Sequence, residues 1–189
     1  MEIQHEVSLK DHTTFKTGGL ARLFCVVTTR EELVEAIAYI QIEKIPFYIL
    51  GGGSNVLVSE KGFEGLVIKI AIQGICFMDH GTDTVRMSVE AGMSWDECVQ
   101  VVVERGLYGL ENLSLIPGTV GAAPIQNIGA YGVEVKDSIE SVEVFNIETK
   151  SFETLTKEMC QFGYRDSLFK KREGKKYIVV GVQFLLSRK

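Results

Sequence analysis

A long segment of small residues in the second half of the chain constrains the fold more than any other feature. The segment from Ile116 to Gly132 consists mostly of glycine, alanine, proline and short hydrogen-bonding residues. A compact domain seldom holds an unstructured connection of this length unless the connection has a function. Small residues let a large, flat ligand lie against the backbone, and Thr119, Gln126, Asn127 and Tyr131 can bond to its edge. The segment therefore predicts a ligand surface made partly of backbone.

A second glycine-rich segment follows a short apolar stretch in the first half of the chain. Gly51, Gly52 and Gly53 precede Ser54 and Asn55. Consecutive glycines allow positive φ angles and close approach of a ligand, and successive N–H groups in such a turn can hold an anion. A tight turn without any ligand explains the glycines equally well. The segment is neither a P-loop nor a Rossmann fingerprint, because it lacks the closing Lys-Ser/Thr and the G-x-G-x-x-G spacing.

A third segment, from Phe162 to Lys170, carries one arginine of interest. Arg165 is permanently charged and can bind a carboxylate with two parallel hydrogen bonds. The alternative is an ordinary ion pair with Asp166 or with another surface acid. The residue types alone favour that alternative.

The first part of the chain predicts a β-α-β arrangement. Strands are expected at 22–28, 47–50 and 65–70, where β-branched, aromatic and other apolar residues gather. Thr29 is a suitable N-cap for a helix between the first two strands, because apolar residues recur after it at helical spacing. Pro46 ends that helical pattern. The glycine-rich segment at 51–55 therefore follows a strand.

The pattern changes after about residue 72. Strands are expected at 84–90, 139–147, 152–155 and 177–186, and the middle two form a hairpin across the Glu148-Thr149-Lys150 turn. A helix is expected between Ser94, as its N-cap, and Gly106, as its stop. The predicted fold class is therefore α+β with two lobes, residues 1–72 and 73–189.

Composition excludes several functional classes. The chain has 189 residues, 46% of them hydrophobic, and a net charge of −5, which argues against a nucleic-acid surface. The cysteines and histidines are too scattered for a metal site or a disulfide framework; they are Cys25, Cys76, Cys98, Cys160, His5, His12 and His80. We expect four reduced and mostly buried thiols. The start of the chain does not resemble a signal peptide, and no apolar run is long enough to span a bilayer. We therefore expect a cytoplasmic protein with no metal, membrane or nucleic-acid partner.

The three segments, taken together and in this order, resemble those of the UDP-N-acetylenolpyruvoylglucosamine reductases. The matching stretches are Gly51 to Leu57, Ile116 to Gly132 and Tyr164 to Lys170. Thr14-Phe15 with Gly18-Gly19 is similar to the N-terminal motif of this family, although Thr13 stands where an Asn is usual. The resemblance extends over nearly the whole chain.

The resemblance implies a two-lobed FAD-binding fold of the vanillyl-alcohol-oxidase (PCMH) type, with FAD between the lobes. It assigns the pyrophosphate of FAD to the first glycine-rich segment, at Gly51, Gly52, Gly53, Ser54 and Asn55. It assigns the lining of the cofactor from the other lobe to Pro117, Gly118, Thr119, Gly121, Gln126, Asn127 and Gly129.

The resemblance also implies a reaction. In this family NADPH reduces the flavin, which then passes hydride to the enolpyruvyl group of UDP-N-acetylglucosamine enolpyruvate, giving UDP-N-acetylmuramate for peptidoglycan synthesis. Arg165 matches the active-site arginine of the family, and Tyr164 beside it is a weaker, substrate-binding candidate. A fixed cation at this position can stabilise negative charge that develops next to the carboxylate of the substrate.

The chain departs from the family pattern after the flavin-binding lobes. The family carries a C-terminal domain that supplies a proton-donating serine and an assisting glutamate, and we find no motif for either here. Either the sequence is shortened, or a second chain completes the site. Two alternatives stay open: a non-catalytic flavin- or nucleotide-binding module, and another flavin oxidase of the same fold. Tyr164-Arg165-Asp166-Ser167 argues against the oxidase.

Overall fold

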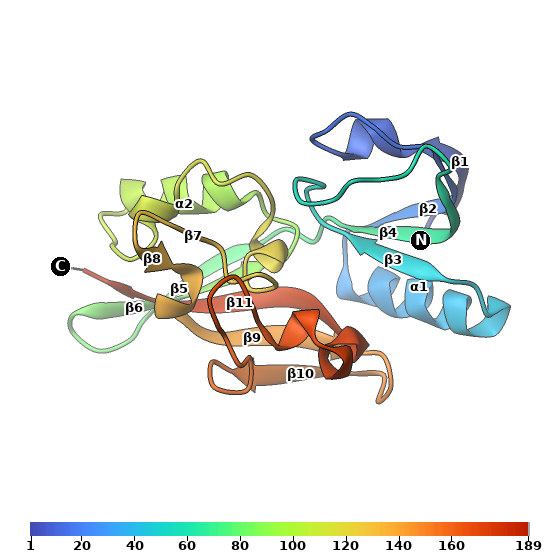
Figure 1. Cartoon of the computed structure of the whole chain (residues 1–189). Coiled ribbons are helices and arrows are strands. Elements are labelled where there is room, and N and C mark those ends of the chain that lie inside the picture. The colour runs from blue at the N-terminus through green and yellow to red at the C-terminus, as the bar shows by residue number, and fades with distance from the viewer. Residues whose placement is uncertain (189) are drawn as a thin grey trace. The chain divides into compact units, whose positions relative to one another are not determined.

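The computed structural model describes residues 1–188 and divides into two compact units, Met1–Ile72 and Gln73–Lys189 (Figure 1). The division falls at the residue where the sequence pattern changes.

Unit 1 contains a four-stranded sheet in the order β1-β2-β4-β3. Strands β2 (Leu20–Val27), β4 (Phe63–Ile70) and β3 (Phe47–Leu50) run parallel, and β1 (Gln4–Ser8) pairs antiparallel with β2. The three parallel strands confirm the strands expected from the sequence. We did not predict β1, because it is a short edge strand with mostly exposed, polar residues and therefore has no apolar alternation.

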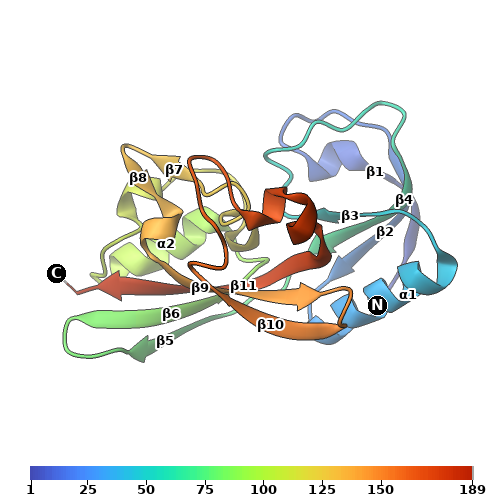
Figure 2. The same cartoon turned by 60° about the horizontal axis from the view of Figure 1, so that its bottom comes forward.

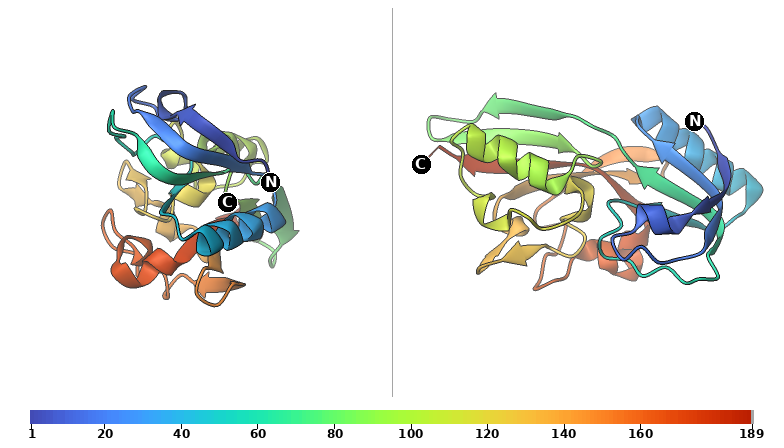
Figure 3. Two further views of the ribbon diagram at one scale, coloured as in Figure 1. Left: turned by 90° about the vertical axis from the view of Figure 1, so that its right-hand side faces the viewer. Right: turned by 90° about the horizontal axis from the view of Figure 1, so that it is seen from above.

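Helix α1 (Arg30–Glu43) connects β2 to β3 and packs on one face of this sheet (Figure 3). The predicted N-cap is confirmed, since the hydroxyl of Thr29 accepts a hydrogen bond from the N–H of Glu32 at 3.2 Å. The helix buries the apolar residues that recur at helical spacing between Leu33 and Ile40. On the other face lie the 3₁₀ turn η1 (Leu9–His12) and the loop that joins β3 to β4.

Unit 2 contains a five-stranded antiparallel sheet in the order β10-β9-β11-β6-β5 (Figure 2). Its strands are β5 (Ile75–Asp79), β6 (Thr84–Glu90), β9 (Ile139–Asn146), β10 (Ser151–Thr156) and β11 (Tyr177–Ser187). The β9–β10 hairpin and the strands β6 and β11 confirm the expected elements. Strand β5, which pairs with β6, was not predicted because its edge position leaves Cys76 and Met78 exposed.

Helix α2 (Trp95–Glu104) packs on one face of this sheet. The rings of Trp95 and Phe184 lie 6.1 Å apart, and the indole N–H donates to the carbonyl of Leu113 at 2.7 Å. The expected cap is wrong in one respect: Ser94 makes no side-chain capping bond. The carbonyl of Gly118 instead accepts from the N–H of Trp95 at 3.1 Å, so the long loop takes over the capping role.

The small-residue segment is partly structured. It contains the 3₁₀ turn η3 (Val120–Ala122) and the first strand of the short β7–β8 hairpin, Gly129–Ala130 with Val133–Glu134. The N–H of Gly121 donates to the carbonyl of Ala91 at 2.9 Å, which fixes the segment along the connection between β6 and α2. The remaining 3₁₀ turns are η2 (Glu111–Leu113), η4 (Val135–Asp137), η5 (Leu168–Lys170) and η6 (Arg172–Lys176).

The thiols are free, and three of the four are buried. Burial raises the pKa of both Cys98 and Cys160 to about 12, so these two stay protonated at neutral pH. Within residues 1–188 we find no group of three or more His, Cys, Asp or Glu side chains placed to hold a metal ion. No helix in the described part of the chain is long and apolar enough to cross a membrane.

Candidate functional site

The glycine-rich loop at 51–55 begins directly after β3, at the carboxyl end of a parallel strand. Ligands of open sheets with parallel strands bind at this end, because the loops there leave the sheet together. Gly52 and Asn55 are exposed, Gly51 and Ser54 are half-buried, and Gly53 is buried. The loop therefore presents part of its backbone to a ligand and part to the protein.

Gly53 must be glycine for two independent reasons. Its φ of 70° lies in the left-handed region, and a Cβ at this position would lie 2.0 Å from the carbonyl oxygen of His12. Its own carbonyl accepts from the N–H of Thr14 at 3.0 Å. The N-terminal segment at 12–14 therefore packs directly against the loop and leaves no room for a side chain at Gly53.

Two successive backbone donors of this loop form no hydrogen bond in the described part of the chain. Within residues 1–188, the N–H groups of Gly52 and Gly53 donate no hydrogen bond to any other group of the chain. Buried backbone N–H groups are nearly always paired, whereas donors without a partner in the chain can bond to water or to a ligand acceptor. Successive N–H groups in such a turn form an anion site, and the pyrophosphate of a dinucleotide suits it.

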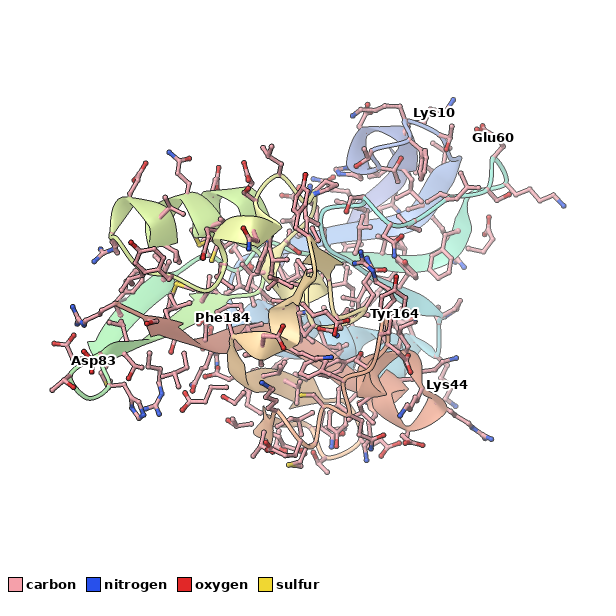
Figure 4. All side chains as sticks on the ribbon, turned by 60° about the vertical axis from the view of Figure 1, so that its left-hand side comes forward. Lys10, Lys44, Glu60, Asp83, Tyr164 and Phe184 are labelled. Carbon is pink, nitrogen blue, oxygen red and sulfur yellow. The ribbon has the colours of Figure 1, made fainter. Side chains whose placement is uncertain are left out.

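The third sequence segment forms a tight turn at residues 163–166 in unit 2. The N–H of Gly163 donates to the carbonyl of Asp166 at 2.9 Å, and the N–H of Asp166 donates back at 3.2 Å. Tyr164 (labelled in Figure 4) and Arg165 occupy the tip, where the side chain of Tyr164 is 86% exposed. Arg165 has a φ of 51°, a conformation that costs a non-glycine residue free energy. The turn therefore exposes both residues and holds Arg165 in an unfavourable backbone conformation.

The guanidinium of Arg165 binds a carbonyl and not a carboxylate. One of its terminal nitrogens donates to the carbonyl of Gly129 at 2.6 Å, and Lys170 donates to the backbone carbonyl of Arg165 at 2.8 Å. The pairing with Asp166 that the residue types favour is wrong: within residues 1–188, Arg165 forms no ion pair. Most donors of the guanidinium thus stay available.

Two buried side chains connect this turn to the small-residue segment. The amide nitrogen of Asn127 donates to the carbonyl of Gly163 at 2.9 Å, and its amide oxygen accepts from the N–H of Lys136 at 3.1 Å. The hydroxyl of Ser167 donates to the carbonyl of Ile125. The structure therefore brings the predicted substrate residues and part of the predicted cofactor lining together within unit 2.

The residues expected to line the cofactor from unit 2 divide into two groups. Pro117 is exposed, and Gly118, Thr119, Gln126 and Gly129 keep part of their surface. Gly121 is buried, and a Cβ there would lie 2.5 Å from that of Ala91, so packing alone requires this glycine. The side chain of Asn127 is bonded within the chain, and its contact with a cofactor stays a prediction.

Three residues of the site were not assigned from the sequence. Ser167 belongs to the third motif and Thr14 to the N-terminal motif. Both could have been found by treating every residue of a motif as a candidate. The sequence gives no indication of a role for Lys170, because its bond to the carbonyl of Arg165 depends on how η5 packs against the turn at 163–166.

Comparison with known proteins identifies the class. A family model described as "FAD binding domain" matches residues 21–152, and the chain belongs to this family. The match includes the loop at 51–55 and the small-residue segment.

Among relatives, the chain is similar to UDP-N-acetylenolpyruvoylglucosamine reductases. It is 43% identical over 189 residues to that of Pseudomonas aeruginosa, covering 100% of this chain and 55% of the relative. It is 41% identical over 184 residues to that of Neisseria gonorrhoeae, covering 97% of this chain and 53% of the relative. The chain thus spans about half the length of these relatives.

Solved structures agree on the fold. The UDP-N-acetylenolpyruvylglucosamine reductase of Thermus caldophilus matches with a TM-score of 0.79 at 36% identity, over 98% of this chain and 62% of that one. A solvent-stable cholesterol oxidase matches with a TM-score of 0.63 at 11% identity, over 88% of this chain and 34% of the other, which shows the fold alone. The α+β FAD-binding fold of the vanillyl-alcohol-oxidase type is therefore confirmed.

Proposed function

We propose that this chain is the FAD-binding part of an NADPH-dependent UDP-N-acetylenolpyruvoylglucosamine reductase of peptidoglycan synthesis. The observation that carries the proposal is the pair of unpaired N–H groups at Gly52 and Gly53, at the carboxyl end of a parallel strand. This arrangement suits a diphosphate, and it lies in the segment that first indicated the family. The similarity of the whole chain to curated reductases supports the same function.

The residues present fit FAD in both units. In unit 1 the backbone of Gly51, Gly52 and Gly53, with Ser54 and Asn55, would hold the pyrophosphate. In unit 2 the partly exposed residues of the long segment would line the cofactor: Pro117, Gly118, Thr119, Gln126 and Gly129, with Gly121 and Asn127 shaping the segment from within. When bound, FAD supplies the hydride chemistry that connects NADPH to the enolpyruvyl substrate.

Arg165 would act on the substrate. Hydride addition to the enolpyruvyl group places negative charge next to its carboxylate. A guanidinium presented on a fixed turn binds that carboxylate and stabilises the charge as it develops. Its single contact with Gly129 leaves the other donors for the substrate. Tyr164, exposed beside it, would contact the UDP-sugar.

The complete reaction requires more than these residues. The proton donor and the assisting glutamate of the family would come from a further domain or from a second chain, which would also bind the UDP-sugar. The reaction would take place in the cytoplasm, where NADPH and nucleotide sugars occur. The second candidate is a flavin-binding module without catalysis, which the same unpaired N–H groups would equally support.

An absorbance spectrum of the purified chain tests the proposal. Addition of FAD is expected to give a bound-flavin spectrum, and anaerobic NADPH is expected to bleach it. A folded chain that binds no flavin would contradict the proposal. A bound flavin that NADPH cannot reduce would favour the non-catalytic module.

A further inference from the structure

Two polar side chains of unit 2 are completely buried, and both connect the same two segments. Asn127 and Ser167 each have 0% of their surface exposed, less than any other buried polar residue of the described chain. Asn127 lies in the small-residue segment and bonds to Gly163, whereas Ser167 follows the turn and bonds back to Ile125. The two bonds run in opposite directions between residues 125–127 and 163–167.

Burying an amide and a hydroxyl is unfavourable unless both are satisfied. Transfer of such a group to a protein interior without a partner costs roughly 1–3 kcal/mol. Here the amide uses both ends, since the oxygen of Asn127 also accepts from the N–H of Lys136. Apolar residues would fill the same space without this cost, so the bonds serve orientation more than stability.

The two bonds lie at the two ends of the turn that carries Arg165. The carbonyl of Gly163 at its start is held by Asn127, and Ser167 at its end is held by Ile125. The tip is attached at a third point, where the guanidinium of Arg165 donates to Gly129 at 2.6 Å. A turn held at both ends and at its tip is restricted in its backbone geometry and in the direction of the Arg165 side chain.

Backbone strain supports the same interpretation. Asn127 and Arg165 both have positive φ angles, 47° and 51°. Each such residue costs about 1–2 kcal/mol in an unconstrained chain, so the surrounding bonds must maintain this conformation. The two positive φ angles lie in the two segments that these side-chain bonds connect.

We propose that Asn127 and Ser167 are positioning residues, which fix the turn at 163–166 so that the guanidinium of Arg165 meets the carboxylate of the substrate. Asn127 then acts through the turn and not by direct contact of its amide with the cofactor. This role rests on the proposed function of Arg165, because the turn would otherwise need no fixed geometry.

Fluorine NMR of the full chain labelled with 3-fluorotyrosine tests the positioning directly. Tyr164 sits at the tip of the turn, and the loss of one resonance in Tyr164→Phe assigns its signal. In Asn127→Gly the backbone keeps its positive φ but both amide bonds are lost, and in Ser167→Ala only the hydroxyl is lost. Both variants are expected to shift the Tyr164 resonance toward the value of the unfolded chain and to narrow it.

Asn146→Gly is the matched control. Asn146 is also buried and bonded at both ends of its amide, to Glu153 and to the N–H of Glu148, but it belongs to the β9–β10 hairpin. The Asn146→Gly substitution should leave the Tyr164 resonance unchanged. Fluorescence of the buried Trp95 confirms that each variant is folded. An unchanged Tyr164 signal in folded Ser167→Ala would overturn the proposal.

A titration separates this inference from the proposed function. The FAD-loaded chain is titrated with UDP-N-acetylglucosamine enolpyruvate while the Tyr164 resonance is followed. The parent chain should respond, and Ser167→Ala should bind about 10-fold more weakly, the change that about 1.4 kcal/mol produces. Equal affinity in the two chains would overturn the positioning role. A parent chain that does not respond would show that these residues alone do not bind the substrate, and the variant spectra would then decide whether Asn127 and Ser167 hold the turn.

Discussion

The loop at 51–55 and the turn at 163–166 are built by opposite means. In unit 1 the backbone forms the site: Gly53 packs against the carbonyl of His12 with no room for a side chain, and Gly52 lies exposed beside it. In unit 2 side chains form the proposed site, because Asn127 and Ser167 bond to a turn whose proposed function depends on the side chain of Arg165. A site made of backbone is damaged when atoms are added, whereas a site made of side-chain bonds is damaged when atoms are removed.

The difference follows from the two sheets. Parallel strands direct their loops to one end of the sheet, so in unit 1 the topology itself places the loop after β3. The antiparallel sheet of unit 2 offers no such common end. The turn at 163–166 belongs to the connection between β10 and β11 and not to the sheet, so specific bonds must hold its position.

The largest expected effect tests the backbone-built site. Gly53→Ala should destabilise the chain by roughly 3 kcal/mol, because the new Cβ would meet the carbonyl of His12 and the left-handed φ is unfavourable for alanine. Gly106→Ala is the control: Gly106 has a φ of 65° but nothing within 4 Å of its Cβ position, so only about 1 kcal/mol is expected. Urea unfolding of both variants measures the difference. Equal losses would show that close packing against His12 is unimportant.

The next effect concerns ligand binding. Gly52→Val should weaken FAD binding by roughly 100-fold, a change of about 2.7 kcal/mol, because a branched side chain would block the exposed backbone from the pyrophosphate. Quenching of FAD fluorescence on binding measures the affinity. Stoichiometric flavin in a folded Gly52→Val chain would remove the loop from the cofactor site.

Arg165→Ala is the counterpart in unit 2. It should bind FAD nearly as well as the parent chain, because Arg165 is assigned to the substrate. Loss of flavin from a folded variant would place the guanidinium at the cofactor instead.

A smaller effect is the pH dependence of stability that comes from His12, which packs against the glycine-rich loop. The ring of His12 stacks on Phe24 at 4.5 Å, and burial together with the nearby Lys69 lowers its pKa below the ordinary 6.5. The unfolded chain therefore takes up a proton before the folded chain does. The stability from the neutral ring is fully present above pH 6.5 and is lost as the pH falls through the lowered pKa.

His12→Phe keeps the stacking and removes the titration. Free energies of unfolding at about pH 8 and about pH 5.5 should differ less in this variant than in the parent chain. The same difference in both chains would mean that other groups cause the loss in acid.

The smallest effect is expected away from both sites. Arg86 binds Glu140 with two hydrogen bonds, of 2.5 and 2.7 Å, across the intervening strand β11. The guanidinium lowers the pKa of Glu140 below its ordinary 4.5, so this contribution is present above that pH and is lost as the pH falls through the lowered pKa. Both side chains are partly exposed, and Glu140→Gln should cost at most about 1 kcal/mol at neutral pH. Thermal unfolding measures it, and a loss of several kcal/mol would refute the assignment as a surface pair.

The sequence by itself determined most of the helices and strands, the order of the motifs and the family. Apolar periodicity located α1 and α2, alternation located most strands, and three glycine- and arginine-bearing segments indicated an FAD-binding reductase. These features are local, since each depends on residues a few positions apart, and local spacing is what a helix or a strand converts into one buried face. The polar edge strand β1 was missed for the same reason.

Only the tertiary structure decided which groups the members of the motifs contact. It placed the carbonyl of His12 against Gly53, the guanidinium of Arg165 on Gly129 and the amide of Asn127 on Gly163. Each of these contacts joins segments about 35 to 40 residues apart. The groups in contact are common side-chain and backbone groups, so the sequence alone does not show which of them pair. Whether a buried amide binds a ligand or its own chain depends on which backbone packs beside it, and that is fixed by folding and not by the motif.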